Sequence, residues 1–278
     1  MERTTSVPVA GGQLRFVTRG AGPLLLLIAG GSGGGSFFTG MARFLAEHYS
    51  VVTYDRWGYG GTTLDDPDAD MRIERHSEDA FALLTALTTE PAFVFGSSAG
   101  GLVALDLLSR YPQQVRLVVA HEPTVSGVLP AFDQAQQQHL ATYQQAGAMV
   151  ALAELGAENA GADGGREDDV ELPPPDMASA ALSAEVLFRS TVPALLRYRF
   201  DATALAAARQ KLMLAGSRVG REHATPVYQC TTALAERLGL PVLDFPGNHV
   251  GCISHPRAFA ARLHAVLSKP AGPDAASV

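Results

Sequence analysis

The chain has 278 residues, of which 47% are hydrophobic and 18% are charged, and its formal net charge is −7. This length is enough for one large α/β domain, or for a core with a small subdomain. The acidic balance, without a basic stripe, argues against a nucleic-acid partner.

The apolar runs of the chain are all short. The longest, LLLLIA at residues 24–29, falls far below the roughly 20 residues that a membrane-spanning helix needs, and residues 1–13 contain no signal-peptide stretch. Cys230 and Cys252 form neither a disulfide framework nor a metal pattern, so ordinary thiols are expected. We therefore expect a cytoplasmic protein with a small-molecule substrate and with no membrane, nucleic acid, metal or organic cofactor; a homodimer is left open.

Short apolar runs alternate with helical patterns along most of the chain. Two N-terminal strands are predicted first, followed by strands at residues 23–30, 49–55, 92–97, 115–122, 211–216 and 241–247. Helical patterns lie between most of them, including residues 76–87, 104–112 and 256–267. Near-continuous apolar strands that alternate with helices are typical of a parallel sheet covered on both faces. The predicted fold class is therefore α/β, with a mostly parallel, doubly wound sheet.

The alternation is interrupted between residues 122 and 211, where no strand pattern occurs. Helical patterns rich in Ala, Gln and Leu predict an inserted cap at residues 128–204, which divides the core into residues 1–127 and 205–278. Within the cap, residues 156–175 are acidic and rich in Gly and Pro, a composition that predicts a mobile loop. The tail, residues 269–278, is expected to fray.

Two serines lie between glycines in GSSAG, residues 96–100, where a strand pattern gives way to a helical one. Only Ser98 has glycine two places before it and two after it, which fits the G-x-S-x-G motif. This motif needs a tight turn in which flanking side chains would collide with the backbone. Ser98 is therefore the predicted nucleophile, and a purely structural turn serine is the alternative.

His249 lies in the glycine-flanked segment PGNHVG, after the last predicted strand and before the last predicted helix. Loops at the carboxyl ends of parallel strands carry the chemistry in α/β sheets. His249 can therefore reach Ser98 and act as its general base. His255, next to Pro256, is the competing histidine, and we expect it at the surface or in the first turn of the last helix.

These residues, together with YDRWGYGGT at residues 54–62, resemble the α/β-hydrolase superfamily over most of the chain outside the cap. The resemblance implies a serine hydrolase whose oxyanion hole uses the N–H of Ala99 and one from the loop after the third strand. Gly31 matches that second position, and Ala29 stands where family members often have histidine. A nucleotide-binding loop is the weaker reading of this glycine-rich segment, because neither phosphate-binding spacing occurs.

The acid of the expected triad departs from the common family pattern. Residues 217–220, SRVG, stand where many relatives carry an aspartate, and Glu222 lies further along that loop. Some α/β-hydrolases instead place the acid after the strand that follows the nucleophile's helix, and Glu122 occupies that place. Glu122 is therefore the predicted acid that orients His249; a surface carboxylate is the alternative.

Aromatic side chains are the candidate walls of a substrate pocket, although helix packing is the alternative for those in the cap. The candidates are Phe37, Phe38, Trp57, Phe188 and Tyr198. They favour an ester or lactone of a hydrophobic or aromatic small molecule, cleaved through an acyl-enzyme. The alternatives are thioester, amide or carbon–carbon bond hydrolysis on the same triad, and a non-catalytic ligand-binding protein on a hydrolase scaffold.

Overall fold

The computed structural model describes residues 2–31, 33–66, 69–160, 165–168, 170 and 177–269. In this part of the chain one sheet contains nine strands in the order β1-β2-β4-β3-β6-β7-β8-β9, with β5 paired to β2. The strands are β1 (Glu2–Val9), β2 (Gly12–Arg19), β3 (Leu24–Ile28), β4 (Ser50–Tyr54), β5 (Thr63–Leu64), β6 (Ala92–Ser97), β7 (Val115–His121), β8 (Leu212–Ser217) and β9 (Val242–Phe245).

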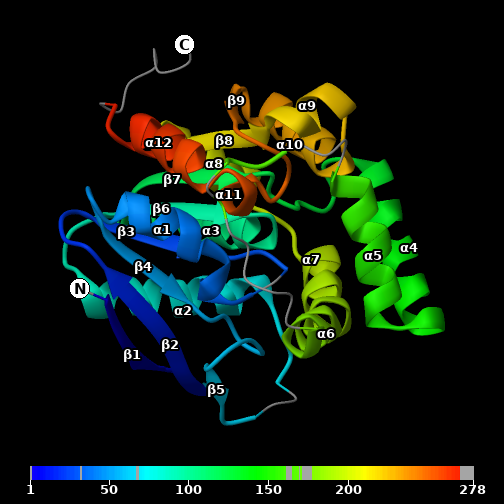
Figure 1. Cartoon of the computed structure of the whole chain (residues 1–278), viewed down its shortest axis with the longest axis horizontal. Coiled ribbons are helices and arrows are strands. Elements are labelled where there is room, and N and C mark those ends of the chain that lie inside the picture. The colour runs from blue at the N-terminus through cyan, green and yellow to red at the C-terminus, as the bar shows by residue number, and fades with distance from the viewer. Residues whose placement is uncertain are drawn as a thin grey trace.

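Helices connect most of these strands (Figure 1). They are α1 (Thr39–Leu45), α2 (Ile73–Leu87), α3 (Ala99–Arg110), α4 (Pro130–Ala146), α5 (Ala148–Ala160), α6 (Met177–Val186), α7 (Val192–Arg197), α8 (Ala202–Ala207), α9 (Arg218–His223), α10 (Pro226–Leu238), α11 (Gly251–Ser254) and α12 (Pro256–Leu267). Three short helical turns complete the set: η1 (Gly35–Phe38), η2 (Leu187–Thr191) and η3 (Arg209–Lys211).

The sheet is mostly parallel. The pairs from β4 through β3, β6, β7 and β8 to β9 are all parallel, whereas β2 pairs antiparallel with β1, β4 and β5. The predicted fold class is thus confirmed. Because parallel strands all end at the same edge, the loops that follow β3, β6, β7, β8 and β9 converge there.

Side chains of β3 alternate between two hydrophobic cores, as the pleat of a strand requires. Leu25 and Leu27 pack with residues of α1 and α12 on one face of the sheet. Leu26 and Ile28 pack with residues of α2, α3 and α10 on the other face. Burial on both faces explains why the central strands are apolar at nearly every position.

Between β7 and β8 the described residues form helices joined by loops, and none of them forms a strand. Figure 1 shows α4, α5, α6 and α7 gathered beside the sheet, and we call these four the cap helices. The predicted loop at residues 156–175 begins inside α5, which continues to Ala160. Residues 161–164, 169 and 171–176 of that loop, and residues 270–278 of the tail, lie outside the described residues.

No helix among the described residues combines the length and apolar character that crossing a bilayer requires. The same residues hold no cluster of three His, Cys, Asp or Glu side chains suited to a metal ion. Cys230 and Cys252 are buried free thiols. Burial raises the pKa of Cys230 to about 12, which makes it an unreactive thiol at neutral pH.

Candidate active site

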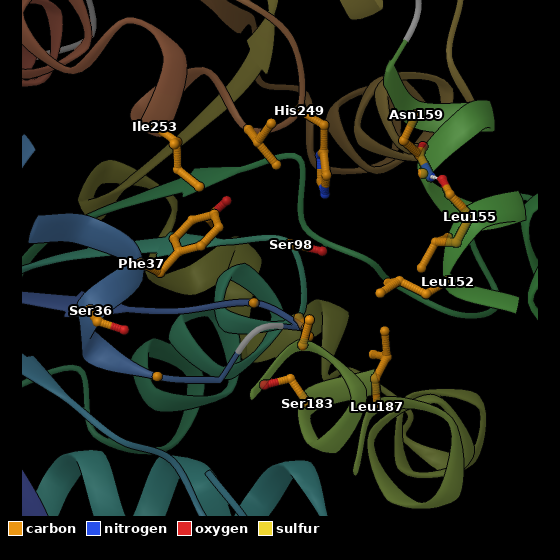
Figure 2. Close-up of a pocket in the computed structure, with 18 of the residues that line it drawn as sticks. Ser36, Phe37, Ser98, Leu152, Leu155, Asn159, Ser183, Leu187, His249 and Ile253 are labelled. Atoms are coloured by element: carbon orange, nitrogen blue, oxygen red, sulfur yellow. Dashed lines mark hydrogen bonds between the residues drawn. The ribbon is translucent and has the colours of Figure 1, made fainter. Parts of the chain in front are cut away.

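Ser98 occupies the sharp turn between β6 and α3. Its backbone has φ 57° and ψ −125°, a conformation that costs a residue other than glycine roughly 1–3 kcal/mol. A hydrogen bond of 2.9 Å from the Ser98 N–H to the His121 carbonyl oxygen holds the turn against β7. This geometry directs the serine hydroxyl into a cavity (Figure 2).

Gly96 and Gly100 allow this turn to pack against the sheet. A Cβ on Gly96 would lie 2.3 Å from the Gly100 carbonyl oxygen, and a Cβ on Gly100 would lie 2.1 Å from the Ile28 carbonyl oxygen. These neighbours are backbone atoms of the central sheet and of the turn itself, so they cannot move aside cheaply. The two glycines of the motif are therefore required by close backbone approach.

The side chains of Glu122 and His249 contact each other. The Glu122 Oε2 and the His249 Nδ1 lie 2.6 Å apart. The other carboxylate oxygen, Oε1, accepts hydrogen bonds from the Ser217 N–H at 2.8 Å and from its hydroxyl at 2.7 Å. Glu122 itself has a positive φ of 44° at the end of β7, which turns its side chain toward this cluster instead of continuing the strand.

The charge state of Glu122 fixes the tautomer of His249. Burial alone would raise the pKa of Glu122, but the hydrogen bond from His249, the nearby imidazoles and the Ser217 hydroxyl together lower that pKa to about 2. An ionised carboxylate only accepts hydrogen bonds, so the imidazole carries its hydrogen on Nδ1. The other ring nitrogen, Nε2, is then the acceptor, and Figure 2 shows the ring of His249 directed toward Ser98.

Ser98 and His249 line a cavity of about 1710 Å³ between the sheet edge and the cap helices. Three leucines, Leu152, Leu155 and Leu187, reach it from the cap side (Figure 2). Its polar wall includes the neutral amides of Gln136 and Asn159, both buried. Charged side chains also line it, namely Arg19, Arg43, Arg166 and Asp168. The last three are solvent-exposed, so most of this charge stands where the cavity meets solvent.

The structure brings part of the predicted site together around this cavity. Gly31 and Ala99, the expected oxyanion donors, line it beside Ser98, and so does Phe37. Phe38 and Trp57 are not among its lining residues, which corrects the expected pocket wall. Phe38 is fully buried in the sheet core, and Trp57 is 5% exposed beneath the guanidinium of Arg75, whose Cζ lies 4.4 Å from the indole ring.

Two cap aromatics also lie away from the cavity wall. Phe188 is buried and stacks on Tyr143 with 5.9 Å between ring centroids. The Tyr198 hydroxyl donates a 2.7 Å hydrogen bond to buried Asp106 of α3, which ties the segment after α7 to the core. Both residues thus follow the packing alternative considered for the cap.

Sequence reasoning missed two features of this site. Ser217 stands where the resemblance leads one to expect an aspartate, yet it donates two hydrogen bonds to Glu122. The cap leucines Leu152, Leu155 and Leu187 carry no sequence signal that separates a cavity wall from ordinary helix packing. The sequence signal for the role of Ser217 was a hydrogen-bonding residue at the position where many relatives carry an aspartate.

Comparison with known proteins identifies relatives of the chain. A family model described as "alpha/beta hydrolase fold" matches residues 23–157. The chain is also 34% identical over 278 residues to the uncharacterized hydrolase YraK of Bacillus subtilis (strain 168), a similarity that covers 95% of this chain and 96% of that protein.

Solved structures share the architecture at low sequence identity. A thermophilic esterase from Thermogutta terrifontis has a TM-score of 0.73 at 14% identity, covering 95% of this chain and 98% of that one. The enol-lactonase from Burkholderia xenovorans LB400 has a TM-score of 0.69 at 18% identity, covering 95% and 100%. Likeness at this level of identity extends to the fold and not to the substrate.

Proposed function

The chain belongs to the α/β-hydrolase fold family, and from this premise we propose that it is a serine hydrolase that cleaves carboxylic esters or lactones. Ser98 is the proposed nucleophile, His249 the general base and Glu122 the acid that orients it. The single observation that supports this assignment best is the 2.6 Å contact between Glu122 Oε2 and His249 Nδ1, beside a strained serine turn.

In the proposed acylation, the Ser98 Oγ attacks the carbonyl carbon while its proton passes to the His249 Nε2. Glu122 stabilises the imidazolium that forms and keeps Nδ1 protonated throughout. The carbonyl oxygen becomes an oxyanion, which the backbone N–H groups of Gly31 and Ala99 would bind. Each such donor typically lowers the barrier by about 2.7–4 kcal/mol.

The tetrahedral intermediate that carries this oxyanion then collapses. His249 gives its proton to the departing alkoxide, which leaves as an alcohol, and Ser98 stays acylated. A water molecule, deprotonated by His249, attacks the acyl carbon and releases the carboxylic acid with Ser98 restored. For a lactone the alcohol and the acid remain on one molecule.

The cavity supports an uncharged, largely apolar substrate. Leu152, Leu155 and Leu187 offer apolar surface, and each methylene group buried there contributes about 0.8 kcal/mol. Gln136 and Asn159 supply neutral hydrogen-bonding groups suited to a hydroxyl or a second carbonyl of the substrate. Relatives of the fold include a named esterase and a named enol-lactonase, which agrees with this substrate class.

Hydrolysis of thioesters, amides or carbon–carbon bonds on the same triad is the retained alternative. Cytoplasmic location stays a prediction of the sequence, and a homodimer stays open. A panel of 4-nitrophenyl esters of increasing acyl length and of aliphatic and aromatic lactones tests the proposal. We expect turnover of some members, abolished in Ser98→Ala and retained in the matched variant Ser97→Ala. Turnover of thioesters or amides alone would move the assignment to the alternative.

A further inference from the structure

Arg56 is a buried cation beside the proposed oxyanion loop. It lies just after β4, and its side chain is 0% exposed. Its Nη2 donates a 2.5 Å hydrogen bond to the Gly30 carbonyl oxygen, and its Nη1 lies 3.3 Å from the His76 Nε2. Its Cζ stands 5.1 Å from the centre of the Tyr59 ring. The guanidinium therefore contacts the loop, a histidine and an aromatic face.

No carboxylate among the described residues forms an ion pair with Arg56. Asp55 pairs with Arg15, and Asp79 pairs with Arg75. Burial, followed by the charges of Arg56 and Arg75, lowers the pKa of His76 well below its usual range, so this imidazole stays neutral and accepts from Arg56. A buried charge without a counterion is costly, which points to a functional role for Arg56.

The hydrogen bond from Arg56 to the Gly30 carbonyl oxygen sets the direction of the Gly31 N–H. In a trans peptide the C=O of one residue and the N–H of the following residue point in opposite directions. The Gly30 carbonyl is fixed toward Arg56 and also accepts from the Gly33 N–H at 2.9 Å. The Gly31 N–H must therefore point away from Arg56.

Ser98 lies close to this peptide. A Cβ built on Gly30 would be 2.8 Å from the Ser98 Cβ, and Gly30 and Gly31 line the cavity together with Ser98. The Arg56 backbone adds a second tether, because its N–H donates to the Gly33 carbonyl oxygen at 3.0 Å. One residue thus holds both ends of the turn from Gly30 to Gly33.

We propose that Arg56 is a positioning residue for the oxyanion hole: it orients the Gly30–Gly31 peptide and polarises it, so that the Gly31 N–H becomes a stronger donor to the oxyanion. This inference rests on the proposed function. A hydrogen bond from a cation to a carbonyl strengthens the donor at the other end of the same peptide, because linked hydrogen bonds polarise one another. The planar fork of arginine reaches Gly30 and His76 at once, which a lysine ammonium does not do equally well.

The test compares 4-nitrophenyl butanoate with its thionoester, in which sulfur replaces the carbonyl oxygen. Sulfur accepts hydrogen bonds weakly, so the thionoester gains little from the oxyanion hole. We expect Arg56→Met to lower kcat for the oxygen ester about 10- to 100-fold, with KM near the native value and a much smaller loss for the thionoester. Arg56→Lys should recover part of the ratio of kcat for the oxygen ester to kcat for the thionoester, because it restores a charged donor.

Arg75→Met is the matched control, since it removes a neighbouring cation, 17% exposed, that pairs with Asp79 and stacks on Trp57. The rates for the two substrates should then change in parallel. Titration of reactive Ser98 with a fluorophosphonate normalises each rate to folded enzyme. If Arg56→Met does not fold, Arg56→Gln serves as the neutral variant. Parallel losses for both substrates in the Arg56 variants would overturn the positioning role while leaving the hydrolase proposal intact. A native chain that hydrolyses neither ester would overturn both.

Discussion

The Glu122 carboxylate and the His249 imidazole lie 2.6 Å apart across 127 residues of chain. The strand between them in the sheet, β8, makes this contact possible. Its Ala215 carbonyl oxygen accepts a 2.8 Å hydrogen bond from the Glu122 N–H, and its Ser217 donates twice to the carboxylate. The acid is thus held by three bonds to β8 before it meets His249.

Replacing the carboxylate by an amide tests this arrangement. In Glu122→Gln the amide can donate to Nδ1 and so favour the wrong tautomer of His249, and the negative charge that stabilises the imidazolium is lost. We expect kcat for the best ester of the panel to fall by about 10³- to 10⁴-fold. Glu222→Gln, which changes an exposed carboxylate of α9, should retain the native rate. Equal rates in the two variants would remove Glu122 from the triad.

Acid should weaken the fold partly through Glu122. Its pKa is about 2 in the folded chain against an ordinary 4.5, so between these values the unfolded chain binds more protons. The stabilisation is therefore complete above pH about 4.5 and is lost as pH falls toward 2. Urea unfolding across this window should show a shallower loss in Glu122→Gln than in the native chain. The opposite order would mean that the carboxylate is not stabilised as described.

The Ser217 hydroxyl should contribute to both stability and rate. Ser217→Ala removes one hydrogen bond to a buried carboxylate while the backbone N–H bond remains, so we expect a loss of about 2 kcal/mol in the free energy of unfolding. A loosened Glu122 should also lower kcat by about tenfold. Thr85→Ala, on the exposed side of α2, controls for loss of a hydroxyl. A native rate in Ser217→Ala would show that the backbone bond suffices.

The glycines of the turn offer a packing test. Gly100→Ala places a Cβ 2.1 Å from a carbonyl oxygen of β3, and we expect it to destabilise the fold by about 3 kcal/mol or more. Gly156→Ala is the matched variant, because it lies inside α5 with nothing within 4 Å of the added Cβ. It should stabilise the chain by up to about 1 kcal/mol. Urea midpoints of the two variants that shift in the same direction would contradict the packing argument.

The apolar cavity predicts a dependence on acyl length. Each added methylene should raise kcat/KM by about fourfold until the cavity is filled. Leu155→Asn, which puts an amide on the cavity wall, should flatten this series. Leu182→Asn should not, because Leu182 is 70% exposed on α6. If kcat/KM rises equally with acyl length in the native chain, Leu155→Asn and Leu182→Asn, the acyl chain binds outside this cavity.

The sequence predicted the sheet, the turn at Ser98 and the loop that carries His249 because these depend on local patterns. Apolar runs identify strands, and a glycine-flanked serine needs only its neighbours to be recognised. Glu122 was assigned through the resemblance to those α/β-hydrolases that place the acid after the strand following the nucleophile's helix.

Tertiary packing decided what the sequence could not predict. Phe37 and Phe38 are adjacent in the chain, yet one lines the cavity and the other enters the core. The direction of a loop side chain depends on what packs against it, as the placement of Trp57 under Arg75 illustrates. The contact of Arg56 with Gly30 joins two loops that the sheet brings together, so no local pattern announces it.

Covalent labelling is the most direct test of Ser98 as the nucleophile. The native chain is treated with a fluorophosphonate probe, the intact mass is followed with time, and the labelled peptide is mapped. We expect rapid addition of one probe at Ser98, absent in Ser98→Ala, retained in Ser97→Ala and much slower in Glu122→Gln. A native chain that stays unlabelled, or that carries the label on another residue, would contradict the assignment of Ser98 as the nucleophile.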